Sequence, residues 1–514
     1  MPPATLPRRL CAVLLVLAQL LLPLRAHAQA QAQALPSMGD GNEMTLAEER
    51  SLGDSIAREL YRDPDYIDDP VVYEYVQQVW QRLLAAARVR GEITPELDER
   101  FAWTFIMGRD PAINAFALPG GYMGLNMGLV AVVGSRDELA AVLGHETSHI
   151  TQRHISRMMA QQSRQTPLML AGMILGIIAA AKSNNGDAGQ ALMVGSQAYF
   201  MQNQLAYSRD MEREADRIGF GVMTQAGFAP QGAASLFEKL QYASRLNDNG
   251  SYPYLRNHPL TSERIADMQS RFQLIPGANN KLPLAMDQAM ISSRARALTR
   301  PGVDVLRLWI ESATGPDFAR ASPAQQAGTL YAAAMAANEM HDAKTARALV
   351  QRLIVRTAGD PAATRLAHLL SAEIELAAGS PATAAALIDP KSKERPEILL
   401  AAQAALASHA PAPMVPVLRD WVATHTRDAT AWRTLASLYE EQGDPVASIR
   451  ADAEANVAIL DYAAARDRFR AAQDLIRKGG VKIDDYEASI LDTRARAVDQ
   501  LVREQADDER QMKR

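Results

Sequence analysis

The spacing of apolar and polar positions predicts a chain that is helical for most of its length. Helical periodicity starts at Thr45 with a capping-box pattern, and an amphipathic helix follows over residues 71–90. From Phe101 the pattern changes to apolar and β-branched runs separated by Pro-Gly and Gly-Gly turns, which are typical of a small sheet. Helix resumes at Ser135, again behind a capping box. The first half of the chain is therefore expected to combine helices with a small sheet.

Beyond residue 290 the sequence becomes alanine-rich and gives hardly any strand signal. Helix starts recur at Asp360, Arg395 and Asp428, at intervals of about 34 residues that are typical of tetratricopeptide repeats. The last of these segments also carries residues at the offsets of that repeat, namely Trp432, Leu435, Tyr439, Gly443, Ala465, Phe469 and Ala472. The resemblance is good over residues 428–475 and weaker upstream, and an ordinary alanine-rich helical bundle is the alternative.

The N-terminus has the pattern of a secretory signal peptide. Arg8 and Arg9 precede an apolar run, and Ala26-His27-Ala28 supplies small residues around a cleavage site. The run is shorter than the roughly 18 apolar residues that cross a membrane, which argues against the alternative of an anchor. Removal of residues 1–28 also removes Cys11, the single cysteine of the chain. We therefore expect an exported protein whose metal ligands are histidine and carboxylate.

Composition and charge exclude several classes of protein. The chain has 514 residues, 48% of them hydrophobic and 22% charged, which excludes wholesale disorder. Its 54 basic and 59 acidic side chains give a formal net charge of -5, so there is no electrostatic reason to expect a nucleic-acid partner. A second apolar run, Leu168–Ala181, is short for a membrane span. A buried helix and a helix at a membrane surface are both open alternatives for this run.

The strongest chemical signal is the sequence His145-Glu146-Thr147-Ser148-His149. On a helix, positions i and i+4 lie on one face, so the imidazoles of His145 and His149 can bind one metal ion. Zinc accepts histidine nitrogen and carboxylate oxygen, and a catalytic zinc site keeps one position for water. Glu146 lies beside that position, where a carboxylate can act as general base and later protonate the leaving amine. The alternative is an exposed helix with two solvated histidines.

A third ligand is expected from the charged segment at residues 208–219. Glu212 and Asp216 are four residues apart and share a helical face, whereas Glu214 points about 160° away. One of the two carboxylates on that face can bind the metal while the other accepts an N–H from a ligand histidine. An exposed charged helix face is the alternative. His154 lies about 140° off the metal face, so we expect it to pack or form hydrogen bonds locally.

Several segments together resemble the M48 family of zinc metallopeptidases, and within it the exported members that carry tetratricopeptide repeats and act in outer-membrane assembly. The matching segments are HETSHITQRH at 145–154, YSRDMEREADRIG at 207–219, NAFALPGG at 114–121 and RNHPLTSERI at 256–265. The resemblance covers roughly residues 40–275 and is looser over the repeats. It implies that Glu212 is the third zinc ligand and that Asp216 holds a ligand histidine. Thr147-Ser148 departs mildly from the family pattern, which should affect helix packing and not ligation.

His258 lies in the last of these segments, which approaches the active site in the family. As an imidazolium it would stabilise the oxyanion of the tetrahedral intermediate. As a neutral imidazole it would occupy the fourth zinc position, exclude water and keep the enzyme latent. Residues 250–262 would then form a lid over the site. A structural histidine in a loop is the third alternative.

The segment from Asn114 to Gly121 is expected to form an edge strand beside the zinc. An extended substrate can add to such an edge as a further strand, with main-chain pairing to Asn114, Ala115 and Phe116. This mode recognises extended backbone with little regard to sequence, which suits a protease of unfolded chains. An ordinary sheet edge is the alternative.

The sequence thus predicts a mainly helical α+β protein, with a zincin-type M48 metalloprotease domain that contains a small β-sheet, followed by a tetratricopeptide-like α-solenoid. The expected boundaries are a signal peptide at 1–28, a polar leader at 29–43, the protease at 44–285, a linker at 286–321, repeats at 322–480, and a C-terminal helix with a charged tail at 481–514.

The resemblance implies a periplasmic endopeptidase that binds one Zn2+ per chain and degrades misassembled or stalled outer-membrane proteins. The repeats would dock it on these clients or on the assembly machinery, and a peripheral association with the outer membrane is an open alternative. The competing class is a chaperone or adaptor in which the protease is nearly always latent. An intramembrane protease would need several long apolar spans, which the sequence lacks.

Overall fold

The computed structural model describes residues 44–161, 171–172, 174–176, 209–245, 253–273, 283–479 and 485–512. The expected signal peptide and polar leader lie outside the described residues, as does most of the apolar run at Leu168–Ala181. Among the described residues of that run, Ala171 and Ile174 are buried in an apolar cluster with Leu52 and Leu118. The described helices include none whose length and apolar character together would span a lipid bilayer.

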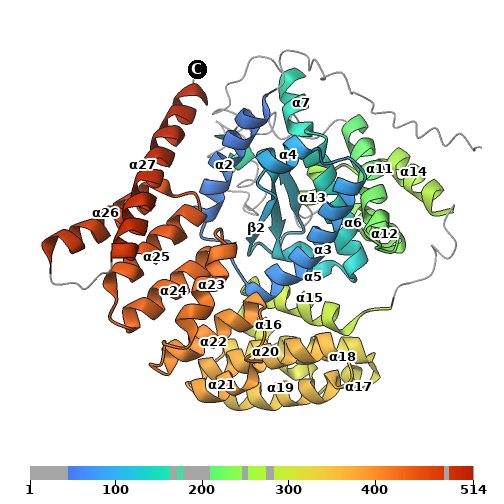
Figure 1. The fold of residues 1–514 in the computed structure, drawn as a ribbon. Helices are drawn as coiled ribbons and strands as arrows, with labels where there is room; N and C mark the ends of the chain where they lie inside the picture. Colours follow the sequence, from blue (N-terminus) through green and yellow to red (C-terminus); the bar gives the residue numbers. More distant parts are fainter. Residues whose placement is uncertain are drawn as a thin grey trace, which may run out of the picture. The chain divides into compact units, whose positions relative to one another are not determined.

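The first part of the described chain is a small sheet surrounded by helices (Figure 1). Its elements in order are α2 (Leu46–Arg62), β1 (Tyr66–Ile67), α3 (Pro70–Val89), α4 (Pro95–Arg100), β2 (Thr104–Gly108), β3 (Ala115–Leu118), the 3-10 turn η1 (Pro119–Gly121) and β4 (Tyr122–Asn126). The strand order is β1-β2-β4-β3, with β2 and β4 parallel and the other neighbours antiparallel. β3 therefore lies at an edge of the sheet.

The tight turn between β3 and β4 depends on glycine. Gly120 and Gly121 have φ angles of 69° and 86°, in the left-handed region that other residues rarely adopt. A Cβ at Gly121 would come within 2.7 Å of the Cβ of Phe101. The turn lets β3 fold back on β4, with Ala117 opposite Met123, so that the outer edge of β3 faces helix α6 (Arg136–Thr151).

Helix α6 carries the HExxH residues and is buried along nearly its whole length. Ser135 caps it, because its side chain accepts the backbone N–H of Glu138. The helix packs against α3 and β3 and against two later helices, α11 (Arg209–Gln225) and α12 (Gln231–Arg245). The motif residues therefore lie in the interior of this part of the chain.

The close approach of α11 to α6 depends on two small residues. Gly144 on α6 faces Gly219 on α11, and a Cβ at Gly219 would lie 2.8 Å from the backbone nitrogen of His145. This contact brings the acidic segment of α11 up to the histidines of α6. The remaining helices of this part are α5 (Met127–Val132), α7 (His154–Gln161), α13 (Pro253–Asn257) and α14 (Ser262–Gln273).

The second part consists of helices that pack on their neighbours in the sequence (Figure 1). They are α15 (Met286–Leu298), α16 (Val303–Ser312), α17 (Pro316–Arg320), α18 (Pro323–Glu339), α19 (Ala343–Thr357), α20 (Pro361–Ala377), α21 (Pro381–Leu387), α22 (Arg395–Ala407), α23 (Met414–Thr424), α24 (Ala429–Glu441), α25 (Pro445–Ala458), α26 (Tyr462–Lys478) and α27 (Asp485–Met512). Aspartates cap several of them through the side chain, as Asp360 and Asp428 do for α20 and α24. The predicted α+β domain followed by helical repeats is confirmed.

The segment expected as a linker, residues 286–321, forms three helices, and α15 is buried between α5 and α18. Three arginines then bridge carboxylates of the first part to carboxylates of the repeats: Arg294 with Asp69 and Glu373, Arg365 with Glu74 and Glu397, and Arg395 with Asp68 and Asp428. The repeats are therefore fixed to the sheet-containing part by ion pairs and by a buried helix.

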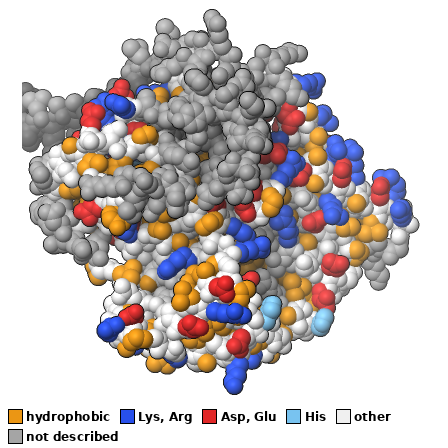
Figure 2. Space-filling model, turned by 180° about the vertical axis from the view of Figure 1, so that it is seen from behind, with side chains coloured by type: hydrophobic (Ala, Val, Ile, Leu, Met, Phe, Trp, Pro, Cys, Tyr) orange, Lys and Arg blue, Asp and Glu red, His pale blue; other side chains and the backbone are white. Residues whose placement is uncertain are grey.

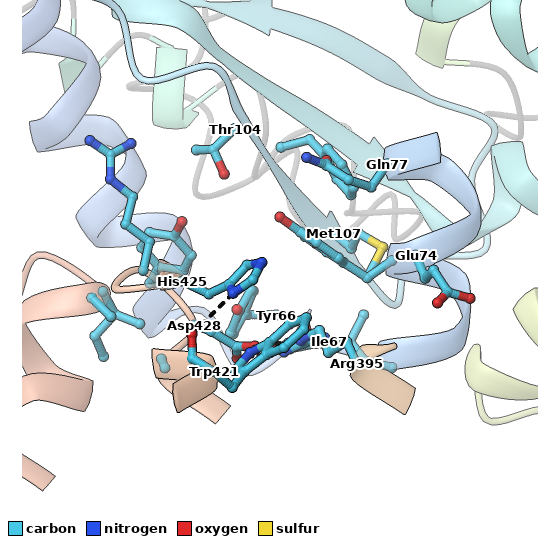
Figure 3. A pocket seen from close by; sticks show the side chains of 18 of the residues that line it. Tyr66, Ile67, Glu74, Gln77, Thr104, Met107, Arg395, Trp421, His425 and Asp428 are labelled. Carbon is cyan, nitrogen blue, oxygen red and sulfur yellow. Dashed lines mark hydrogen bonds and ion pairs between the residues drawn. The ribbon is translucent and has the colours of Figure 1, made fainter. Parts of the chain in front are cut away.

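A cavity of about 470 Å³ lies where the repeats meet α3 and β2. Figure 3 shows Trp421 and His425 lining it from the repeats, and Thr104 and Met107 lining it from the sheet. The rings of Trp421 and His425 are stacked with their centroids 3.7 Å apart. Ion pairs thus join the two parts, and a cavity remains between them.

Charged side chains of both signs are interspersed on the described part of the face seen in Figure 2. Neither sign gathers there into one extended patch. Large exposed apolar side chains include Val303 and Leu308 on α16, which are 52% and 61% exposed. Single exposed apolar residues of this kind are ordinary on a protein surface.

Candidate metal centre

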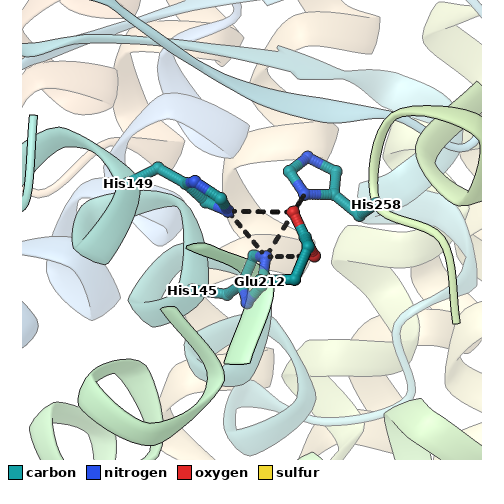
Figure 4. A group of neighbouring side chains, drawn as sticks. All are labelled: His145, His149, Glu212 and His258. Atoms are coloured by element: carbon teal, nitrogen blue, oxygen red, sulfur yellow. Dashed lines mark hydrogen bonds and ion pairs between the residues drawn. The ribbon is translucent and has the colours of Figure 1, made fainter. Parts of the chain in front are cut away.

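Four buried side chains converge on one point (Figure 4). They are His145 and His149 of α6, Glu212 of α11, and His258, which directly follows α13. One candidate ligand atom from each lies within 4.8 Å of those of the other three. The structure therefore brings together the three expected ligands and adds His258 to them.

The spacing of these atoms fits a single metal ion. The Nε2 atoms of His145 and His149 are 3.0 Å apart, and Nδ1 of His258 lies 3.3 Å from Nε2 of His145. Glu212 Oε1 lies 3.4 Å from Nε2 of His149 and 2.9 Å from Nδ1 of His258. Ligands at about 2.1 Å from a tetrahedral zinc ion are about 3.4 Å from one another. The donors therefore fit zinc in both chemical kind and spacing.

Glu146 lies at the rim of this cluster and is 0% exposed. Its Oε2 accepts the backbone N–H of Ala117 at 2.9 Å, which ties the carboxylate to β3. Its Oε1 has no hydrogen-bond partner among the described residues and lies 3.5 Å from Nε2 of His258. Burial raises the pKa of Glu146, although His258 and His145 act in the opposite direction. A carboxylate in this position is suited to accept a proton and return it.

Asp216 and Arg264 contact the candidate ligands and hold their orientation. Oδ1 of Asp216 lies 3.0 Å from Nδ1 of His145, so Nε2 of that ring faces the cluster. Arg264 on α14 donates hydrogen bonds of 2.7 and 2.8 Å to Asp216, and its Nη1 lies 2.7 Å from Oε2 of Glu212. Burial raises the pKa of Asp216, but Arg264 and His145 outweigh this and hold it below its ordinary value. Arg264 is not among the residues that the sequence singles out, although it lies in the segment 256–265.

His154 supports His149 from the side away from the cluster. Its Nδ1 lies 2.8 Å from Nδ1 of His149, and its Nε2 lies 3.0 Å from Oε2 of Glu214, which Arg157 also contacts at 2.8 Å. Because Nε2 of His149 faces the cluster, Nδ1 of His149 carries the hydrogen and donates it to His154. Nε2 of His154 then donates to Glu214. Burial lowers the pKa of His149 well below its usual value, which favours the neutral form that binds metal.

The edge strand and the segment that carries His258 meet beside the cluster. The residues expected to pair with substrate lie in β3 or directly before it: Asn114, Ala115 and Phe116. Tyr254 on α13 donates its backbone N–H to the carbonyl of Ile113 at 3.3 Å. Its ring stacks on His258 with the centroids 4.7 Å apart. Of the lid expected at 250–262, residues 253–262 are described, and His258 among them lies in the cluster.

Residues 71–272 match the family model of peptidase family M48. The chain therefore contains a peptidase M48 domain. The match includes every residue of the metal cluster, together with Glu146, Asp216 and Arg264. The M48 domain accordingly contains both the ligands and the groups that orient them.

Parts of the chain are similar to curated proteins. The chain is 31% identical over 335 residues to the beta-barrel assembly-enhancing protease of Escherichia coli (strain K12), with 64% of each protein covered. It is 37% identical over 291 residues to a Vibrio cholerae protein that bears this name provisionally, with 55% of each covered. It is 30% identical over 198 residues to the mitochondrial metalloendopeptidase OMA1 of Schizosaccharomyces pombe, with 38% of this chain and 51% of that protein covered. In each case the chain spans less than two thirds of the relative's length.

Proposed function

We propose that this protein is a zinc-dependent endopeptidase that acts in the periplasm on misassembled or stalled outer-membrane proteins. The observation that carries the proposal is the convergence of His145, His149 and Glu212, with Glu146 at their rim. Similarity to proteins named beta-barrel assembly-enhancing protease and metalloendopeptidase supports it. The signal-peptide pattern of residues 1–28 supports the exported location.

In this proposal His145, His149 and Glu212 hold one zinc ion per chain. The ion supplies Lewis-acid polarisation of the substrate carbonyl and of water. Glu146 accepts the proton of the attacking water on Oε1 and later donates it to the leaving nitrogen, while Oε2 stays bonded to β3. Asp216 accepts the Nδ1 hydrogen of His145 and so keeps Nε2 of that ring turned inward.

Substrate is proposed to lie as an extended strand along β3, beside residues 114–116, of which Ala115 has its backbone turned outward. The edge position of β3 supports this arrangement, because a strand added at that edge passes beside Glu146. Folded proteins keep their backbone groups paired, whereas stalled or unfolded chains offer an extended backbone. The same edge therefore explains why misassembled clients would be cut in preference to folded ones.

His258 is proposed to keep the enzyme latent. Its Nδ1 lies 3.3 Å from Nε2 of His145 and 2.9 Å from Oε1 of Glu212, which is where a fourth ligand would lie. A group that stabilises the oxyanion would instead leave room for substrate between itself and the metal. His258→Ala is therefore expected to increase cleavage of an unfolded outer-membrane protein while one zinc per chain is retained. A large loss of turnover with zinc retained would contradict latency and favour the oxyanion role.

The repeats are proposed to dock the protease on its clients or on the outer-membrane assembly machinery. The arginine bridges support this role, because they hold the repeats in a fixed relation to the M48 domain. A client bound by the repeats would then reach the edge strand at a defined distance. The test compares crosslinking to assembly intermediates between the wild-type chain and Arg395→Met, in which one of the bridges between the M48 domain and the repeats is lost. Weaker crosslinking of the variant supports this role, and equal crosslinking contradicts it.

A chaperone or adaptor is the second candidate function. The covered cluster favours it, since Tyr254 and His258 both lie against the groups that would act on substrate. Glu146→Gln separates the two functions, because it removes the base and leaves the ligands unchanged. If cells that contain only this variant assemble their outer membrane as well as the wild type, the protease proposal fails. If they do not, capture of clients on the same variant, followed by mass spectrometry, identifies the substrates.

A further inference from the structure

Tyr254 is bonded to the edge of the sheet in the way that a substrate residue would be. The N–H of Asn126 donates to the carbonyl of Asn114, so residue 114 faces β4. The N–H of Ala117 donates to Glu146, so residue 117 faces outward. Because alternate residues of a strand face alternate sides, Ile113 also presents its carbonyl outward. The backbone N–H of Tyr254 donates a hydrogen bond of 3.3 Å to the carbonyl of Ile113. A substrate strand added at this edge would make the same bond.

The ring of Tyr254 is buried in the wall of a small, mainly apolar cavity next to the metal cluster. The side chain is 4% exposed, and the site around it is lined by Ala141 of α6 and by Leu236 and Leu240 of α12. The cavity that these side chains enclose has a volume of only about 20 Å³. The ring centroid lies 6.5 Å from that of His145. An aromatic side chain thus fits closely beside a residue that holds the metal.

A buried acceptor at Asn114, the residue that follows Ile113 in the sequence, lacks a donor within the described part of the chain. Asn114 is 3% exposed, and its Oδ1 has no hydrogen-bond partner among the described residues. An unsatisfied buried amide oxygen is unfavourable, and a substrate N–H would give it a partner. A groove of about 340 Å³ continues from Ile113 past Leu240 to the exposed ring of Tyr242. Space for a longer chain therefore adjoins the residue that Tyr254 imitates.

We propose that Tyr254 occupies a substrate subsite, and that the enzyme selects polypeptide segments with an aromatic side chain at that position. This inference rests on the proposed peptidase function. Helix α13 is short, so Tyr254 imitates one residue of a substrate and not a whole strand. A substrate antiparallel to β3 passes Glu146, beside Ala117, before it reaches Ile113. The aromatic residue is therefore expected on the C-terminal side of the bond that is cut.

The first test measures binding without cleavage. Full-length zinc-loaded Glu146→Gln protein carrying Tyr254→Ala is titrated into fluorescent unstructured peptides that differ at one central position, which is Tyr, Phe, Leu or Ala. The Tyr and Phe peptides are expected to bind roughly 10- to 100-fold more tightly than the Ala peptide, as burial of a ring compared with a methyl group implies. Glu146→Gln protein that retains Tyr254 should bind the Tyr peptide at least about tenfold more weakly. The matched control is Tyr486→Ala on α27, which removes a tyrosine that is 71% exposed and lies outside the proposed groove, and it should leave binding unchanged.

Equal binding of the four peptides overturns the subsite, whether or not the protein cleaves anything. The second test maps the cuts that protein with intact Glu146 and Tyr254→Ala makes in the same peptides. Cuts on the N-terminal side of the aromatic residue support the proposed direction, and cuts on its C-terminal side overturn that direction. An aromatic preference in binding with no cleavage of any peptide refutes the peptidase function while the binding subsite stands.

Discussion

Removal of the His154 imidazole is expected to weaken zinc binding although none of the three proposed ligands is changed. The ring is 0% exposed and lies between His149 and Glu214, with contacts of 2.8 and 3.0 Å. Its Nδ1 accepts a hydrogen bond from Nδ1–H of His149, and its Nε2–H donates one to the carboxylate of Glu214. Both bonds keep the lone pair of His149 directed at the cluster and increase its basicity.

The magnitude follows from the loss of such a partner behind a metal-bound histidine. That loss typically weakens metal affinity by about 10- to 100-fold, or about 1.4–2.8 kcal/mol. His154→Leu removes both hydrogen bonds and should lie at the upper end. His154→Asn keeps an oxygen near the position of Nδ1 but is too short to reach Glu214, so it should lose about tenfold. Glu214→Gln keeps the shape and removes the charge, and we expect a similar tenfold effect.

Competition between the full-length protein and a chromophoric chelator measures these affinities directly. Arg157→Gln is the matched control, because it removes the other partner of Glu214 and leaves His154 in place. Circular dichroism of each zinc-free variant establishes that the fold is retained. Zinc affinity in His154→Leu equal to that of the wild type, or equal to that of Arg157→Gln, would refute the reasoning.

Three further predictions concern the packing, the joint and the metal. Gly219→Ala places a Cβ 2.8 Å from the backbone nitrogen of His145, so it should lower the free energy of unfolding by about 1–3 kcal/mol and reduce bound zinc, as seen by denaturant titration and metal analysis. Arg395→Met leaves Asp68 and Asp428 without their shared cation, and should lower stability by up to about 3 kcal/mol and increase proteolytic nicking between the M48 domain and the repeats. Chelation should lower the thermal midpoint of the wild type and zinc should restore it, whereas His145→Ala should respond to neither in calorimetry.

Local geometry predicts two pairs of candidate ligand and supporting residues, and the resemblance to M48 peptidases selects Glu212 from the second pair. His145 and His149 are one helical turn apart, and so are Glu212 and Asp216. Both pairs occur on helices, and a capping pattern at Ser135 marks the start of the first of these. What the sequence leaves open is which helix faces meet, and that is decided by the contact at Gly219, which no periodicity reveals.

The supporting residues are harder to predict because their partners are distant in the sequence. Arg264 follows Asp216 by 48 positions, and it looks like one more charged residue on a polar helix. Its role depends on burial, since it is 5% exposed beside two carboxylates. Glu214 points away from the metal face, as its spacing predicts, and that orientation is what lets it meet His154.

The segment at 286–321 shows why a buried helix can resemble a linker. α15 places polar residues all round its axis, so it has no clear apolar stripe. Each buried polar group instead finds a specific partner: Gln288 contacts Tyr75 and the carbonyl of Val133, and Arg294 joins two carboxylates. Buried polar groups need such partners, and the partners appear only once the fold is assembled.

In the proposed latency mechanism, Arg264 would let the segment around His258 move while the other proposed ligands keep their places. Its Nη1 donates to the carbonyl of Pro259 at 2.9 Å, one residue after His258, while its other nitrogens hold Asp216. Movement of the lid breaks the bond to Pro259, which costs about 0.5–1.5 kcal/mol. The two bonds to Asp216 remain, because α14 and α11 need not move, and Asp216 still orients His145. A client that competes with Tyr254 for the edge strand could therefore expose the site while the ligands keep their geometry.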